Sequence, residues 1–202
     1  MNYLKRSAEV LIRKKYRPTI MRIYATLGSM LYFGNQVVCP CCGGHFSKFL
    51  SFGVKPRPNA KCPRCGSLER HRLLWLYLKD RTDFFSDNLK VLHFAPEYIF
   101  QKIFKSMPNL DYTSADLSST ISMVKIDITD ISCKDDFFDV ILCIHVLEHV
   151  LDDQKAMREL FRVLKPGGWA IIQSPIDLEI GKTFEDPNVV SPKERERVYG
   201  QS

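Results

Sequence analysis

Short apolar runs alternate with amphipathic stretches in the second half of the chain, from Asn88 onward. One run, Asp139–Ile144, is apolar after its first residue, as expected for a strand buried on both faces. The pattern predicts five strands, Lys90–Phe94, Tyr112–Ala115, Val124–Ile128, Asp139–Ile144 and Trp169–Gln173, and two main helices, Glu97–Met107 and Asp152–Leu164. Such alternation is typical of an α/β fold with a doubly wound, mostly parallel sheet that binds ligands at the carboxyl ends of its strands.

The first half contains a cluster of five of the seven cysteines. Two C-x-x-C pairs, Cys39 with Cys42 and Cys62 with Cys65, are separated by 19 residues, the spacing of a four-thiolate structural zinc site. We therefore expect a zinc ribbon over residues 36–66, with a strand at Phe46–Gly53 and a turn at residues 57–59. Cys41 is the spectator, because only Cys39 and Cys42 give the two-residue gap. Redox chemistry at C-x-x-C is the alternative, and the second pair argues against it.

An amphipathic stretch, Leu68–Lys79, predicts a helix that connects the ribbon to the α/β domain, within residues 67–85. Ser67 is the expected N-cap. We expect its large apolar side chains to be buried against the next domain. These side chains are Leu73, Leu74, Trp75, Tyr77 and Leu78.

Charge divides the chain in the same way as the motifs. Residues 1–80 hold 15 Lys and Arg against 3 Asp and Glu, whereas residues 81–202 hold 14 against 20. The arm at residues 1–35 has scattered basic residues and an apolar stretch, Thr19–Phe33, which is too short to span a bilayer. No secretory signal is present, so a cytoplasmic protein with reduced thiols is expected. The basic half could pack on its own protein, or contact nucleic acid or a membrane surface peripherally.

Acidic residues end two of the predicted strands. Asp116 follows the second strand, where a carboxylate can accept hydrogen bonds from both hydroxyls of a ribose. Asp127 ends the third strand, where a carboxylate can accept from the exocyclic amine of adenine. The two positions therefore indicate a site for an adenosine-containing ligand.

Several stretches resemble the class I S-adenosylmethionine-dependent methyltransferases, which have a Rossmann-like fold. The resemblance covers Leu89–Pro175 and rests on the segments Ser114–Leu117, Lys125–Asp130, Phe138–His149 and Arg158–Trp169. More narrowly, the chain is similar to bacterial proteins that join such a domain to an N-terminal zinc ribbon. The resemblance implies a domain at residues 86–202 that transfers a methyl group from S-adenosylmethionine to a small molecule, glycan or nucleic acid. It assigns cofactor binding to Phe94, Ala95, Pro96, Glu97, Asp116, Leu117, Asp127, Ile128, Ile144 and His145.

The loop after the first strand departs from that family, which usually has glycines there. His93-Phe94-Ala95-Pro96-Glu97 contains none. A side chain restricts the approach of the backbone to a ligand. Ala95 is small and Glu97 could accept a hydrogen bond from the ammonium of the cofactor, so the sequence is compatible with a modified pocket. A non-catalytic binding module on the same fold is the alternative.

The segment His145-Val-Leu-Glu148-His149 also matches the H-x-x-E-H pattern of a class of zinc peptidases. That chemistry needs both imidazoles on one helical face, whereas His145 directly follows a predicted buried strand and is expected on a turn. If an oxygen acceptor has to lose a proton, the sequence offers four candidate bases without choosing among them. They are His145, His149, Glu185 and Asp186.

The 117 residues from 86 to 202 are few for a domain of this family, which normally has two further strands after the fifth. We expect a sheet of five parallel strands in the order 3-2-1-4-5, with the fifth strand at an uncovered edge. The sequence thus suggests a C-terminally truncated or minimal methyltransferase.

Overall fold

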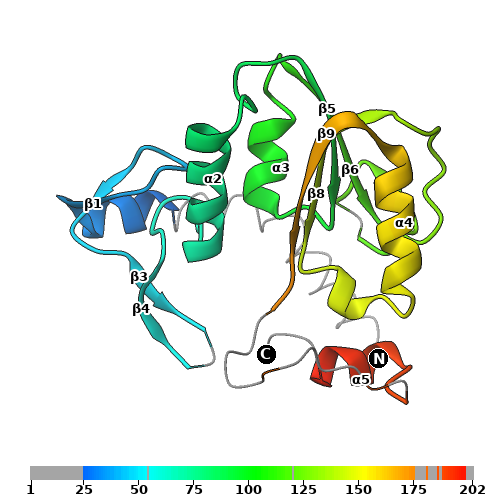
Figure 1. Cartoon of the computed structure of the whole chain (residues 1–202). Coiled ribbons are helices and arrows are strands. Elements are labelled where there is room, and N and C mark those ends of the chain that lie inside the picture. Colours follow the sequence, from blue (N-terminus) through cyan, green and yellow to red (C-terminus); the bar gives the residue numbers. More distant parts are fainter. Residues whose placement is uncertain are drawn as a thin grey trace, which may run out of the picture. The chain divides into compact units, whose positions relative to one another are not determined.

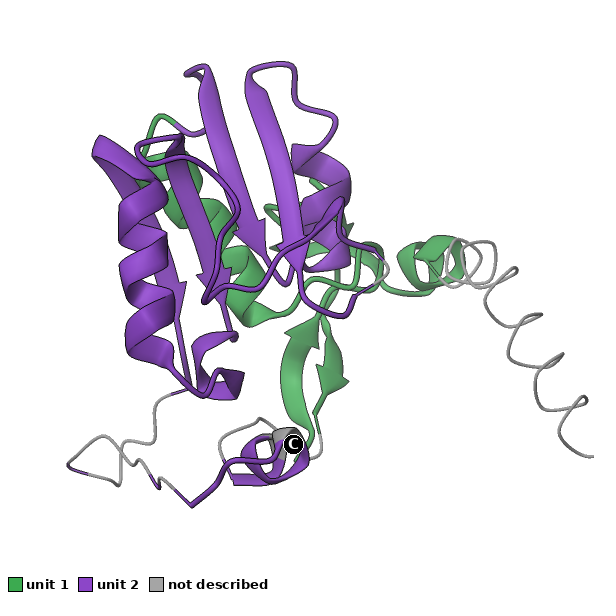
Figure 2. Cartoon of the chain, turned by 90° about the vertical axis from the view of Figure 1, so that its right-hand side faces the viewer, with its two compact units in different colours: residues 1–83 green, residues 84–202 purple. Residues whose placement is uncertain are grey.

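A computed structural model describes residues 25–53, 55–119, 121–175, 181, 186 and 188–198. The chain divides into two compact units, residues 1–83 and 84–202, which Figure 2 shows in different colours. Most of the predicted N-terminal arm lies outside the described residues. Among the described helices, none is long and apolar enough to cross a membrane.

The second unit contains a sheet of five parallel strands among the described residues. These strands run in the spatial order β7-β6-β5-β8-β9, which is the predicted order 3-2-1-4-5. The prediction of a doubly wound sheet is confirmed. The strands are β5 (Leu89–Phe94), β6 (Leu110–Asp116), β7 (Val124–Lys125), β8 (Phe138–Ile144) and β9 (Leu164–Gln173).

Helices α3 (Tyr98–Phe104) and α4 (Asp153–Val163) cover opposite faces of this sheet (Figure 1). On the α4 face, Ala156 and Leu160 pack into a core with Leu92 and Ile141 of the central strands. An aromatic cluster includes Phe104 of α3, whose ring centroid lies 5.2 Å from that of Phe100. The unit also contains the short 3-10 helix η1 (Leu147–His149) and helix α5 (Pro192–Val198).

Two predicted boundaries in this unit are wrong. The third strand ends at Lys125 rather than Ile128, because Asp127 enters a turn closed by Asp130. The fifth strand, β9, begins at Leu164, directly after α4, rather than at Trp169. A register shift opposite β8 and a positive φ of 79° at Gly167 absorb the turn-forming residues without ending the strand.

The first unit carries two small antiparallel sheets and one long helix. Strand β1 (Phe33–Val38) pairs with β2 (His45–Phe46), and β3 (Leu50–Phe52) pairs with β4 (Arg57–Lys61). Helix α2 (Glu69–Arg81) follows, and residues 25–31 are also helical.

The hairpin turn lies before Arg57, so the prediction of a turn at residues 57–59 is wrong. Gly53, with a φ of 108°, provides the reversal there. In α2, Leu74 and Leu78 are buried as expected, whereas Leu73 and Tyr77 are exposed.

Two arginines of the basic half of the chain are engaged within the first unit. The guanidinium of Arg72 donates to the carbonyl oxygens of Ala60 and Ser67 and lies 4.2 Å from the ring centroid of Phe49. Arg57 pairs with Glu69 at 3.1 Å. These side chains hold the hairpin to the start of α2, so they contribute less to an anion-binding surface than the sequence indicates.

Candidate functional site

The sheet of the second unit reverses its winding direction between β5 and β8. In open α/β sheets, ligands bind in the crevice that such a reversal opens at the carboxyl ends of the two strands. Ala95 directly follows β5 and His145 directly follows β8, so both border this crevice. They have positive φ values of 45° and 55°. Strained backbone of this kind is concentrated at functional sites.

The glycine-free loop adopts a glycine-like conformation at Ala95. Its φ lies in the left-handed region, and its N–H donates to the carbonyl oxygen of Ala115 at 2.9 Å. The side chain of Phe94 is buried in the core, so only its main chain borders the crevice. Pro96, the next residue, is also buried. Ala95 therefore occupies the conformation for which a glycine is usually selected.

Glu97 reaches a buried histidine, a contact that the sequence did not reveal. Its Oε2 lies 3.3 Å from Nε2 of His93, and its side chain is only 18% exposed. The other ring nitrogen of His93 lies 2.9 Å from the hydroxyl of Tyr112. Burial, followed by the negative charge of Glu97, raises the pKa of Tyr112. These contacts couple the loop after β5 to the interior of the sheet.

Asp116 lies at the carboxyl end of β6, as predicted. Its Oδ1 accepts hydrogen bonds from the backbone N–H groups of Ser118 and Ser119, at 2.7 and 2.6 Å. These bonds fix the direction of the carboxylate, which is half-buried. Leu117 is 57% exposed. An apolar side chain of this kind beside a fixed carboxylate suits the edge of a nucleoside site.

A buried amide supports the loop after Asp116, and sequence reasoning missed it. Nε2 of Gln101, on α3, donates to Oγ of Ser114 at 2.9 Å and to the carbonyl oxygen of Ile121 at 2.6 Å. Oγ of Ser114 in turn accepts from the backbone N–H of Met123. The signal available in the sequence was the polar residue Gln101 directly after Phe100, on a helix face that is buried. Gln101 thus holds both ends of the loop from Ser114 to Met123.

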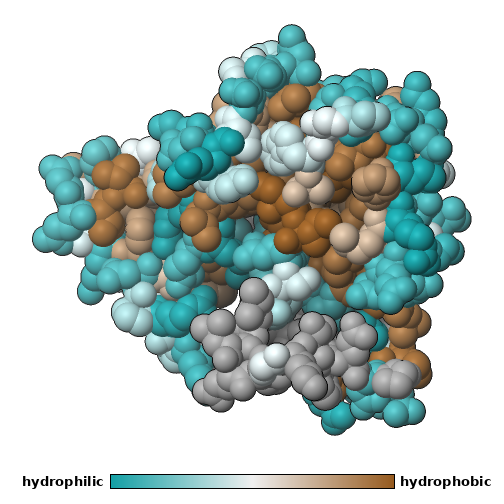
Figure 3. Space-filling model, in the orientation of Figure 1, coloured by the Kyte–Doolittle hydropathy of each residue, from teal (hydrophilic) through white to brown (hydrophobic). Residues whose placement is uncertain are grey.

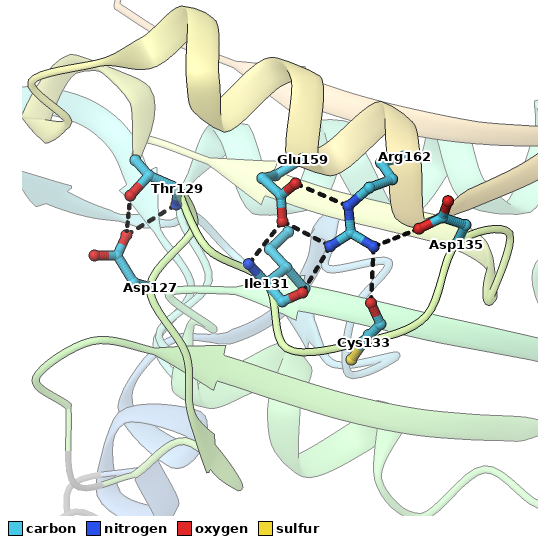
Figure 4. A network of polar contacts seen from close by, with 7 residues as sticks. All are labelled: Asp127, Thr129, Ile131, Cys133, Asp135, Glu159 and Arg162. Atoms are coloured by element: carbon cyan, nitrogen blue, oxygen red, sulfur yellow. Dashed lines mark hydrogen bonds and ion pairs between the residues drawn. The ribbon is translucent and has the colours of Figure 1, made fainter.

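Asp127 is exposed and begins a second supported loop (Figure 4). Its Oδ1 accepts from the backbone N–H and the hydroxyl of Thr129, at 2.8 and 2.9 Å. Ile128 is buried in the core, which anchors the loop beside this carboxylate. Asp127 and Asp116 therefore follow neighbouring strands at the same edge of the sheet.

Helix α4 holds the rest of that loop through an ion pair (Figure 4). The guanidinium of Arg162 donates to the carbonyl oxygen of Ile131 at 2.7 Å and to that of Cys133 at 2.8 Å. It also pairs with the carboxylate of Glu159 at 2.7 Å. Glu159 accepts from the backbone N–H of Ile131 at 2.9 Å. Hydrogen bonds from Arg162 lower the pKa of Glu159 to about 2. The loop that carries Asp127 is thus tied to α4 by a charged clamp.

His145 and Glu148 form a pair beside the crevice. Nδ1 of His145 lies 3.2 Å from Oε1 of Glu148, whose side chain is 7% exposed. Ile144, which ends β8, is buried. His149 is exposed on η1, so the two histidines of the H-x-x-E-H pattern do not lie on one α-helical face. Burial and the charge of Glu148 raise the pKa of the neighbouring Cys143 to about 12, which keeps that thiol neutral.

The remaining two candidate bases lie toward the C-terminus. Asp186 accepts hydrogen bonds from Asn188, and Glu185 lies outside the described residues.

Comparison with known proteins identifies the segment that carries these residues. Residues 100–172 match the family model described as "Methyltransferase domain". The second unit therefore contains a segment of a methyltransferase domain. The model covers α3 to β9, and with them Asp116, Asp127 and His145.

Curated methyltransferases share a smaller part of this domain. The chain is similar to the ubiquinone/menaquinone biosynthesis C-methyltransferase UbiE of Vibrio campbellii, with 39% identity over 67 residues. This match covers 33% of the chain and 24% of that enzyme. UbiE of Proteus mirabilis is also 39% identical, over 33% of the chain and 25% of the enzyme. The chain therefore spans about a quarter of the length of these relatives.

A solved structure, the PH0226 protein from Pyrococcus horikoshii, is similar with a TM-score of 0.42 and 22% identity. The similarity covers 50% of this chain and 55% of that chain.

Four cysteines of the first unit converge, separate from the methyltransferase domain. The Sγ atoms of Cys39, Cys42, Cys62 and Cys65 all lie within 4.8 Å of one another. Cys39 and Cys65 are 3.6 Å apart, and Cys42 and Cys62 are 3.8 Å apart. A tetrahedral zinc ion with bonds of about 2.3 Å needs sulfur atoms about 3.8 Å apart. Within the part of the chain that the structure describes, this is the one such group of candidate ligands.

Ser67 belongs to this cluster rather than to a helix cap. Helix α2 begins at Glu69, with Leu68 as its N-cap, so the predicted cap is wrong. Oγ of Ser67 lies 3.2 Å from Sγ of Cys39 and 3.3 Å from Sγ of Cys65, and the residue is fully buried. Cys41 points elsewhere, because its thiol donates to the carbonyl oxygen of His71 at 3.8 Å.

Proposed function

We propose that the chain is an enzyme that transfers a methyl group from S-adenosylmethionine to a small molecule or glycan. The observation that carries this proposal is Asp116, a fixed carboxylate at the carboxyl end of β6, beside the crevice and within the matched methyltransferase segment. The similarity to UbiE, an enzyme named as a C-methyltransferase, supports methyl transfer as the reaction class. A non-catalytic module on the same fold is the competing proposal.

The residues of the crevice fit the parts of this cofactor. Asp116 would accept from the ribose hydroxyls, with Leu117 packed beside the sugar. Asp127 with Ile128 would flank the adenine, and Ile144 with His145 would line the pocket near the sulfonium. When bound, S-adenosylmethionine supplies a methyl group on a positively charged sulfur, a good leaving group. The protein's part is to hold the acceptor in line with that methyl group and to exclude water.

The loop after β5 would receive the amino-acid end of the cofactor. The left-handed turn at Ala95 lets main-chain atoms approach a ligand as a glycine turn would. The carboxylate of Glu97 would accept from the ammonium group while keeping its contact with His93. Pro96 and the main chain of Phe94 complete this side of the pocket.

The first unit would bind one structural zinc ion through Cys39, Cys42, Cys62 and Cys65. The sulfur separations support this assignment, and a reducing cytoplasm would keep the four thiols available. Four protein ligands close the coordination shell, so the ion would support folding and take no part in methyl transfer. The hydroxyl of Ser67 would donate to the thiolates and offset part of their negative charge.

The carboxylate of Asp116 gives the sharpest test of the proposal. We expect Asp116→Ala to weaken S-adenosylhomocysteine binding about 10- to 100-fold, because charge-assisted hydrogen bonds contribute about 1.5–3 kcal/mol. Isothermal titration calorimetry on the zinc-loaded chain measures the affinity. Asp111→Ala is the matched control, since Asp111 is exposed at the opposite end of the same strand and should leave binding unchanged. A folded wild-type chain that binds no S-adenosylhomocysteine would favour the non-catalytic module.

A further inference from the structure

The pair formed by His145 and Glu148 leaves two polar atoms without partners. Nε2 of His145 and Oε2 of Glu148 are both buried, and neither has a hydrogen-bond partner among the described residues. Burying such atoms unpaired costs free energy, so native structures rarely leave them unsatisfied. The two free atoms therefore indicate that a further polar group is bound at this point.

The pair lies directly after the carboxyl end of β8, which borders the crevice. His145 is the first residue after β8, and its left-handed conformation, with a φ of 55°, turns the chain there. Its N–H donates to the carbonyl oxygen of Gln173, which fixes the turn against β9. The imidazole is 20% exposed and the side chain of Glu148 is 7% exposed, so the pair is largely buried at the carboxyl end of β8.

The chemistry of the pair defines what it can accept. A carboxylate next to Nδ1 favours the tautomer with the proton on Nδ1, which leaves a lone pair on Nε2. It also stabilises the imidazolium that forms if Nε2 gains a proton. Glu148 is held in place by η1, whose carbonyl oxygen at residue 148 accepts from Arg195 of α5 at 3.2 Å. The pair has the arrangement of a general base with its orienting carboxylate.

We infer that His145 is the general base of the proposed methyl transfer and that the acceptor atom is a hydroxyl oxygen. The inference rests on the proposed function. The oxygen forms a bond to the methyl carbon, while the carbon–sulfur bond breaks and its electron pair passes to sulfur. The hydroxyl proton moves to Nε2 of His145, and Glu148 stabilises the resulting imidazolium. Of the four candidate bases in the sequence, this is the one with a buried orienting carboxylate among the described residues.

The tautomer of His145 tests the inference without any acceptor. We expect long-range ¹H–¹⁵N NMR spectra of the full chain, loaded with zinc and S-adenosylhomocysteine, to show the proton of neutral His145 on Nδ1. Glu148→Gln should weaken this preference for Nδ1, since it replaces the facing carboxylate with an amide. Arg195 and Cys143 are the other described ionisable groups beside the pair. A neutral imidazole with its proton on Nε2 would overturn the inference.

Transfer of a radiolabelled methyl group from S-adenosylmethionine to catechol and to methyl α-D-glucopyranoside tests the base directly. His145→Asn should lower the rate at saturating S-adenosylmethionine at least about 100-fold. Asparagine tolerates the left-handed conformation, so this variant should fold. His45→Asn, an exposed histidine of the first unit, is the matched control and should behave as wild type.

The possible results separate the inference from the proposed function. Unchanged transfer in His145→Asn would overturn the base but leave methyl transfer standing. Wild-type protein that binds no S-adenosylhomocysteine would overturn the proposed function itself. If neither hydroxyl probe is methylated, the tautomer decides whether Nε2 can accept a proton.

Discussion

Two residues with left-handed backbone, Ala95 and His145, end the two central strands of the methyltransferase domain. Such a conformation costs a residue with a side chain about 1–2 kcal/mol. Both strands nevertheless end in this conformation, so the chain turns where it borders the crevice. The missing glycine in the usual pattern is a sequence signal for the unusual turn at Ala95, whereas no comparable signal marks His145.

Substitutions at Ala95 separate backbone conformation from side-chain volume. Ala95→Val should lower the free energy of unfolding by about 1–3 kcal/mol, because a β-branched residue is strongly disfavoured at positive φ. Ala95→Asn adds a side chain of similar size that tolerates this conformation and should cost less. Urea denaturation measures both. Equal losses for the two variants would mean that volume, and not backbone conformation, limits this position.

Helix α4 supports the loop after β7 through Arg162 and Glu159 (Figure 4). The loop has no strand of its own beyond Lys125, so these contacts replace a sheet ladder. Asp127 projects from the same loop. We therefore regard the clamp on α4 as a positioning device for the adenine side of the proposed pocket.

The clamp makes stability depend on pH in a defined direction. The pKa of Glu159 falls from about 4.5 to about 2 on folding, so its stabilising contribution is complete above about pH 4.5 and is lost as the pH falls toward 2. Glu159→Gln should therefore reduce the free energy of unfolding more at pH 6 than at pH 3, as measured by urea denaturation. Asp111→Asn is the control. A difference from wild type that does not depend on pH would contradict the lowered pKa.

The elements that the sequence predicted correctly are those with local signals. Hydrophobic periodicity located β5, β8 and α4, and cysteine spacing identified the ligand set that the structure brings together. Contacts between residues far apart in sequence were not predictable. Gln101 supports Ile121 and Ser67 faces Cys39 only because the fold brings them together. Glu148 was visible in a motif, but its pairing with His145 depends on the turn after β8.

The two units depend on different sources of stability. The methyltransferase domain has a continuous apolar core between the sheet and α4. The described part of the first unit has fewer buried apolar residues. A module of this kind obtains much of its folding free energy from its metal ion. Loss of zinc should then affect the first unit selectively.

Each unit contains one of the two tryptophans, which makes this selectivity measurable. In a Trp169→Phe variant, a zinc chelator should change the emission of Trp75 on α2. In Trp75→Phe, the emission of Trp169 on β9 should remain nearly constant. Cys42→Ser should abolish zinc binding, whereas Cys133→Ser, outside the cluster, should retain it. Parallel changes at both tryptophans would mean that the units unfold together.

Strand β9 has a free side in the described part of the chain, where it pairs with β8 alone. Apolar side chains gather over and beside it on the face in view in Figure 3. The first half of this edge is a poor partner for another strand, because Pro166 has no N–H and the pairing around it is irregular. The half from Trp169 to Gln173 pairs regularly with β8 and has no such protection. Purified protein should therefore self-associate through this half on storage, and dilute samples should keep longer than concentrated ones.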